Sequence, residues 1–160
     1  MLQDYQIKTL MLVYELEKTI GDIYAVFAER FPEHKTLWNT LAKEEQEHAE
    51  AVRQLYRLTY EKQVLFDEGS IKTEAVQSIV DYLKRTYDAA KRGKFTAAQA
   101  VSITYDTEKS LIEKNIFKHF KVAPQLAETL QYLQDGSQHH IRLAKKELEK
   151  IQRAHGKPKG

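Results

Sequence analysis

The sequence predicts an all-α protein built as a bundle of four long helices. Apolar residues recur every three or four positions, which is the helical period, and no segment alternates well enough to indicate a strand. The six Gly and three Pro mostly fall where helices would end. We expect helices at residues 4–31, 33–66, 73–92, 95–120 and 123–153. Helices of this length in one small domain pack nearly parallel to one another.

The connections predict how these helices are paired. The turn around Pro32 is very short, so the first two helices should form an antiparallel hairpin. The turn around Pro124 is equally short and predicts a second hairpin. Between them, residues 68–94 form a long crossover that contains the shorter helix. We expect one bundle domain over residues 1–153 and a flexible basic tail over residues 154–160.

Composition excludes several classes of function. The chain has 160 residues, and its 25 Lys and Arg nearly balance 23 Asp and Glu, so charge indicates neither nucleic acid nor a membrane as a partner. The absence of Cys excludes disulfides, thiolate zinc sites, iron–sulfur clusters and a Cys nucleophile. No apolar run approaches the roughly 18 residues of a membrane span, and the N-terminus lacks the features of a secretory signal. We therefore expect a cytoplasmic location.

Five side chains of the metal-ligand type interrupt the apolar stripes of the four long helices. Burying such groups costs several kcal/mol unless they are paired or bind a metal. Glu17 precedes His48 by 31 residues, and Glu108 precedes His140 by 32, so the two hairpins are alike and should place these residues at one height. The five residues are Glu17, Glu45, His48, Glu108 and His140.

This pattern is typical of a site for two divalent metals in a bundle. Such a site takes one Glu from each of two helices and a Glu-x-x-His pair from each of the other two. Glu45 and His48 form one such pair, whereas Ser137 stands where the second pair would have its Glu. His139 is a rival to His140 but falls off the apolar stripe, as Glu15 does beside Glu17. Asp135 points away from His140 unless the helix is distorted around Gly136.

The residues resemble the rubrerythrin branch of the ferritin-like superfamily over about residues 5–152. The matching segments are ELEKTIGDIY with Glu17 and Tyr24, KEEQEHAEAV with Glu45 and His48, YDTEKSLIEKN with Glu108, and GSQHHIRLAKKEL with His140. Asn115 takes the place in the second hairpin that Tyr24 has in the first. Two features depart from the family: Ser137 replaces its second bridging Glu, and the four-cysteine rubredoxin-like iron site is missing.

The resemblance implies a ferritin-like bundle that binds two irons, cycling between Fe²⁺ and Fe³⁺, and reduces peroxide or dioxygen. Glu17 and His48 would hold one metal, Glu108 and His140 the other, and Glu45 would bridge them. Mn or Zn could replace iron, because such sites accept metals according to availability and geometry. The resemblance also implies a homodimer and an external electron donor.

The loss of one carboxylate predicts weaker or single metal occupancy, and it leaves a second interpretation open. In that alternative the chain is a non-enzymatic ferritin-like bundle with an empty or single-metal site and a structural or partner-binding role. Its five polar residues would then satisfy one another as a buried proton-sharing cluster.

Overall fold

The computed structural model describes residues 3–61, 64–66, 72–114, 120–122, 124 and 127–155. These residues include five α-helices, a 3-10 turn and two short strands. The helices are α1 (Asp4–Arg30), α2 (Lys35–Tyr60), α3 (Thr73–Lys91), α4 (Ala97–Lys114) and α5 (Ala127–His155). The 3-10 turn is η1 (Pro32–His34), and the strands are β1 (Val64–Phe66) and β2 (Phe120–Val122). The predicted helical character of the chain is confirmed.

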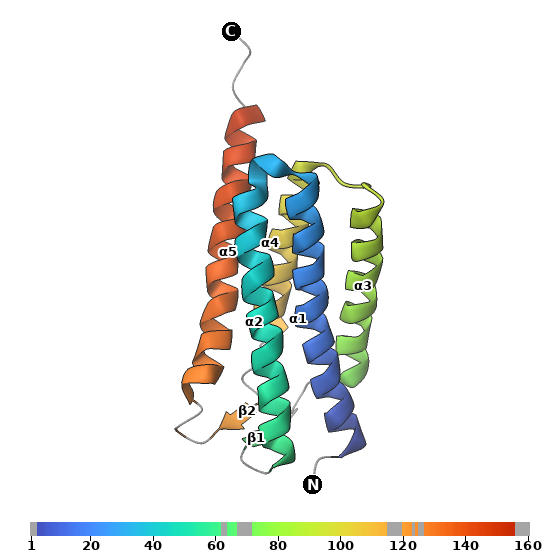
Figure 1. Cartoon of the computed structure of the whole chain (residues 1–160), viewed down its shortest axis with the longest axis vertical. Helices are drawn as coiled ribbons and strands as arrows, with labels where there is room; N and C mark the ends of the chain where they lie inside the picture. Colours follow the sequence, from blue (N-terminus) through green and yellow to red (C-terminus); the bar gives the residue numbers. More distant parts are fainter. Residues whose placement is uncertain are drawn as a thin grey trace.

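The axes of the helices lie nearly parallel to the long axis of the molecule, as Figure 1 shows. α1 and α2 lie side by side and reverse direction at η1, and α4 and α5 form a second neighbouring pair. α3 lies on the outside of α1 (Figure 1). The seam between α2 and α5 joins the two pairs, and this seam positions the site described below.

The turn after α1 follows from its local sequence. A residue that precedes proline is disfavoured in the α conformation, and Phe31, directly before Pro32, has φ −126° and ψ 75°. α1 therefore stops at Arg30. The Arg30 guanidinium then donates a hydrogen bond to the Lys91 carbonyl at the end of α3. Gly93 follows with a φ of +69°, a conformation that favours glycine. These contacts fix the end of α3 against the end of α1.

The prediction that no strand is present was wrong. β1 and β2 pair antiparallel, with Val64 opposite Val122 and Phe66 opposite Phe120. The predicted helices at residues 33–66 and 95–120 were accordingly too long, since α2 ends at Tyr60 and α4 is described to Lys114. β-branched and aromatic residues favour a strand when a partner is available. Here each segment finds its partner at the same end of the bundle (Figure 1).

An aromatic cluster fills the core near the α1–α2 turn. The Trp38 ring centroid lies 5.3 Å from that of Phe27 and 5.5 Å from that of Phe31. Trp38 Nε1 donates a hydrogen bond of 3.2 Å to Thr104 Oγ1, which ties α2 to α4. Glu45 follows Trp38 by two turns of α2. These aromatic side chains therefore form the apolar part of the core on one side of Glu45.

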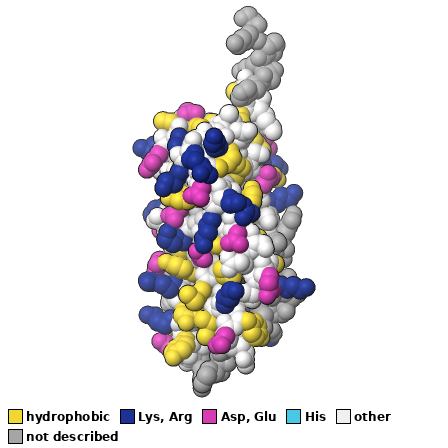
Figure 2. Space-filling view, turned by 90° about the vertical axis from the view of Figure 1, so that its right-hand side faces the viewer, with side chains coloured by type: hydrophobic (Ala, Val, Ile, Leu, Met, Phe, Trp, Pro, Cys, Tyr) yellow, Lys and Arg dark blue, Asp and Glu magenta, His cyan; other side chains and the backbone are white. Residues whose placement is uncertain are grey.

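The outer surface is mixed in charge. Figure 2 looks onto the side that lies at the right of Figure 1 and shows basic and acidic side chains interspersed, with hydrophobic side chains gathered in the lower half. Ala75, Ile79 and Tyr82 of α3 line a groove toward α4. Among the helices that the structure describes, none is long and apolar enough to cross a membrane. α5 continues to His155, and residues 156–160 of the expected basic tail lie outside the described residues.

Candidate metal centre

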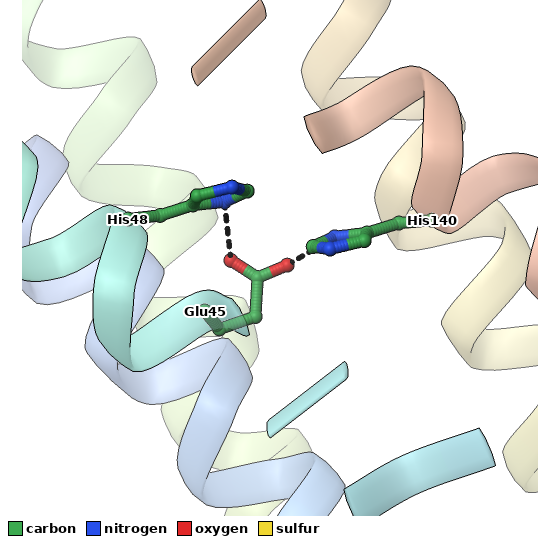
Figure 3. Close-up of side chains that lie close together, drawn as sticks. All are labelled: Glu45, His48 and His140. Atoms are coloured by element: carbon green, nitrogen blue, oxygen red, sulfur yellow. Dashed lines mark ion pairs between the residues drawn. The ribbon is translucent and has the colours of Figure 1, made fainter. Parts of the chain in front are cut away.

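Glu45 lies between two imidazole rings in the middle of the bundle. Figure 3 shows one oxygen of its carboxylate facing His48 and the other facing His140. Glu45 Oε2 is 3.4 Å from His48 Nδ1, and Glu45 Oε1 is 2.7 Å from His140 Nδ1. His48 follows Glu45 by three residues on α2, which places both on one face of the helix. His140 reaches the same point from α5.

Two further carboxylates flank this group, one beside each imidazole. Glu17 Oε2, from α1, lies 3.8 Å from His48 Nδ1. Glu108 Oε2, from α4, lies 3.5 Å from His140 Nδ1. Each of these five residues is at most 3 % exposed. The structure thus brings all five expected residues together, from four helices, with Glu17 on the His48 side and Glu108 on the His140 side.

Two buried atoms at the centre of the cluster lack hydrogen bonds. Within the part of the chain that the structure describes, neither Glu45 Oε2 nor His140 Nδ1 has a hydrogen-bond partner. His140 Nδ1 is close to Glu45 Oε1, but the two groups do not have hydrogen-bond geometry. Buried polar atoms without partners are rare and call for an explanation such as an ion.

The donor set fits a divalent metal. Glu45, His48 and His140 each offer one ligand atom, and these atoms lie within 4.8 Å of one another. Carboxylate oxygen together with imidazole nitrogen suits Fe, Mn and Zn alike. These residues could therefore hold a metal ion.

Two side chains outside the five hold members of the cluster in place. Tyr24 donates a hydrogen bond of 2.6 Å to Glu108 Oε1. Glu44 Oε2 lies 2.8 Å from His140 Nε2, the nitrogen on the far side of the ring from Glu45. A carboxylate on the second nitrogen of a ligating histidine fixes both its tautomer and its orientation. Glu44 thus leaves His140 Nδ1 directed at Glu45 and Glu108.

Sequence reasoning missed Glu44, because it lies in a charged run that is typical of a solvated helix face. A signal was nonetheless present. Glu44 precedes Glu45 by one residue, so it projects from α2 about 100° away and can reach the neighbouring helix. Its side chain is 28 % exposed, which makes it the link between the buried ring of His140 and the surface.

Burial and mutual charge shift the ionisation of the cluster. Burial, reinforced by the neighbouring Glu45 and opposed by His48, raises the pKa of Glu17 to about 8. Burial by itself lowers the pKa of His48, but Glu17 and Glu45 outweigh it and raise that pKa to about 10. Burial likewise lowers the pKa of His140, and Glu108 and Glu45 raise it to about 11. The metal-free cluster therefore holds its protons tightly.

The rival residues lie elsewhere. Glu15 faces α3, where its Oε1 lies 2.6 Å from Lys84 Nζ. Asp135 is exposed and accepts a hydrogen bond of 2.8 Å from Gln131. α5 stays helical through Gly136, so no distortion brings Asp135 inward. Asn115 and the side chain of Ser137 lie outside what the structure describes.

Comparison with known proteins places the chain in a family. No curated protein and no solved structure matches it. The family described as an uncharacterized protein domain, DUF2202, matches residues 6–157, which is most of the chain. The chain therefore belongs to the DUF2202 family.

Proposed function

We propose that this protein is a rubrerythrin-like metal-binding protein with a ferritin-like bundle, which holds a pair of divalent metals and reduces peroxide or dioxygen. The observation that carries the proposal is the position of Glu45, whose two oxygens face Nδ1 of two different histidines. A carboxylate placed in this way is suited to bridge two cations.

The remaining ligands divide into two sets. Glu17 and His48 lie on one side of Glu45, and Glu108 and His140 lie on the other. Three carboxylates offset three of the four positive charges of two divalent ions. The uncompensated charge supports an affinity below that of a four-carboxylate site, or occupancy by one metal. Iron is the proposed metal, and Mn or Zn fits the same ligands.

Two bound ferrous ions would supply the two electrons that, with two protons, reduce one hydrogen peroxide to two water molecules. The protein's part is to hold the ligands and exclude solvent. Tyr24 orients Glu108 through its hydrogen bond, and Glu44 orients His140. The burial of all five ligand candidates keeps bulk water away from the site. Because the two electrons must be replaced after each turnover, the proposal requires an external electron donor.

The activity is tested by adding hydrogen peroxide to anaerobic protein that has been loaded with Fe(II) and desalted. We expect two Fe(II) to be oxidised per peroxide, faster than free Fe(II) under the same conditions, with no hydroxyl radical trapped. Oxidation that is no faster than that of free Fe(II), or that releases radicals, would contradict the reductase.

The non-enzymatic alternative has its own support. The His140–Glu44 and Tyr24–Glu108 contacts satisfy part of the cluster without any metal. A purely structural bundle predicts no change in melting temperature with added Zn²⁺ or Mn²⁺. Metal binding predicts a rise, because a ligand bound only to the folded state stabilises that state.

A further inference from the structure

One stripe of α5 surrounds the His48 ring on three sides. Tyr132, Gly136 and His140 are spaced by four residues and therefore lie along one face of the helix. The Tyr132 ring meets the His48 ring edge-on, with centroids 5.4 Å apart and an interplanar angle of 79°. The His140 ring stacks on His48 at 5.1 Å and 25°. The His48 ring thus lies between two aromatic side chains of α5.

Gly136 lies on α5 midway between Tyr132 and His140, where the backbone faces the His48 ring. A Cβ atom built on Gly136 would lie 2.3 Å from His48 Nε2 and 2.5 Å from His48 Cε1. Both distances are far below van der Waals contact, so any side chain at this position would have to displace the ring. Glycine weakens the interior of a helix relative to alanine. Its presence within the 29-residue helix α5 is explained by the space that the ring occupies.

We propose that Tyr132, Gly136 and His140 form a slot that receives the His48 imidazole, and that Gly136 is a positioning residue of the metal centre. The slot holds the Nε2 edge of the ring against the α5 backbone. The opposite edge is then fixed with Nδ1 toward Glu17 and Glu45, at 3.8 and 3.4 Å. The consequence for metal binding rests on the proposed function, whereas the slot itself is a property of the metal-free protein.

The slot also has an outer anchor. Tyr132 donates a hydrogen bond of 2.9 Å from its hydroxyl to Glu47 Oε2 on α2. Glu47 follows Glu45 by two residues and precedes His48 by one. The Tyr132 ring is therefore held over His48 by the same helix that carries His48, so the two helices position the ring jointly.

The first experiment is a double-mutant cycle on metal-free protein. Gly136→Ala should lower the melting temperature, because the added methyl group collides with the His48 ring. In a His48→Ala background the same substitution should raise it, since the ring is gone and alanine favours the helix. Only a contact between residue 136 and the His48 ring predicts that Gly136→Ala changes the melting temperature in opposite directions in the two backgrounds. An increase of equal size in both backgrounds would overturn the proposal. If Gly136→Ala alone fails to fold, recovery of folding in the double variant supports the slot, and failure of both overturns it.

The second experiment follows the histidine rings directly. Proton–nitrogen correlation spectra of metal-free protein resolve the ring signals, and the signal lost in His48→Ala assigns His48. Gly136→Ala should shift the His48 signals strongly, because the ring leaves its place between Tyr132 and His140. Gln138→Ala, an exposed change on the same helix, should leave them in place. Unchanged His48 signals in Gly136→Ala would contradict the proposal.

Metal affinity then connects the slot to the site. We expect Gly136→Ala to weaken Zn²⁺ binding at least about tenfold, as loss of an orienting contact does at other metal sites, while Gln138→Ala has no effect. If the wild type itself binds no metal, the proposed function fails. The two experiments on metal-free protein still test whether the slot holds the His48 ring. If the wild type binds Zn²⁺ and Gly136→Ala binds it equally well, Gly136 is no positioning residue.

Discussion

The proposed metal centre should depend most on Glu45, because each of its oxygens faces a different imidazole. Glu45→Gln keeps the shape of the side chain and removes its charge. We expect metal affinity to fall by about 100-fold or more, since the loss of residues that merely orient a ligand already costs 10- to 100-fold. Isothermal titration with Zn²⁺ measures the change. Glu50→Gln, an exposed change on the same helix, is the matched control. Equal affinity in Glu45→Gln and the control would remove Glu45 from the ligand set.

Glu44 should act through His140 alone. Its carboxylate lies 2.8 Å from His140 Nε2, on the side of the ring that faces away from Glu45. Glu44→Gln should therefore weaken metal binding by about 10- to 100-fold without abolishing it. The same titration measures this effect, with Glu50→Gln again as the control. A loss as complete as that of Glu45→Gln would make Glu44 a ligand instead of an orienting group.

The shifted pKa values predict how the stability of the metal-free protein changes with pH. Burial raises the pKa of Glu17 from 4.5 to about 8, and the neighbouring carboxylates raise those of His48 and His140 from 6.5 to about 10 and 11 against the effect of burial. In each case the folded state binds the proton more tightly than the unfolded chain does. The stabilisation is complete below the unfolded pKa and is lost as the pH rises through the folded one. The contribution of this cluster to the free energy of unfolding should therefore fall as the pH rises from about 5 to about 11, first through Glu17 and then through the two histidines.

Bound metal should oppose this loss of stability at higher pH, because the metal takes the place of the protons on the same side chains. The difference in melting temperature between Zn²⁺-loaded and metal-free protein should be larger at pH 8 than at pH 6. Differential scanning calorimetry at both values measures it. A metal-free melting temperature that rises from pH 6 to pH 8, or a metal effect that shrinks, would be evidence against the cluster described here.

The five expected ligand candidates could be predicted from sequence, because a charged group in an apolar stripe stands out against the helical period. The sequence marks Glu44 only by its position next to Glu45, and it does not reveal the role of Gly136. The contact of Glu44 with His140 depends on how closely α2 and α5 approach, and the role of Gly136 depends on which way the His48 ring turns. Both are properties of packing between residues that are distant in sequence. The assignment of all these groups as ligands or orienting residues stays a prediction.

At the scale of elements, periodicity predicts the helices well and some of their ends poorly. The start of α1 and its stop before Pro32 follow from local sequence. The ends at residues 66 and 120 were wrong because β1 and β2 pair across a long stretch of chain, Val64 with Val122. A helical period cannot reveal that a segment will find a strand partner elsewhere in the fold.

The end of α3 provides a prediction that does not involve metal. Gly93 has a φ of +69°, and a Cβ there would approach the Arg30 guanidinium, which binds the Lys91 carbonyl. Gly93→Ala should lower the free energy of unfolding by about 1–2 kcal/mol through the left-handed conformation alone. Urea denaturation measures this change. Gly93→Asn should cost less, because asparagine tolerates that conformation better. If Gly93→Ala is as stable as the wild type, this turn does not lock α3 to α1.

At the scale of the whole molecule, the two helix pairs meet at a buried layer of Glu and His side chains. The layer draws on α1, α2, α4 and α5, so metal binding would join all four long helices at one point. This geometry supports a stabilising role for the metal as well as a chemical one, because the candidate ligands come from four different helices.

The most direct test of a metal pair around Glu45 is the iron content of the protein. Wild type and Glu45→Gln are loaded anaerobically with Fe(II), desalted, and measured by elemental analysis. We predict one to two irons per chain in the wild type and none in Glu45→Gln, with two marking a complete pair and one marking the occupancy expected from three carboxylates. No iron in the wild type, or the same iron content in both proteins, would contradict a metal centre built on Glu45.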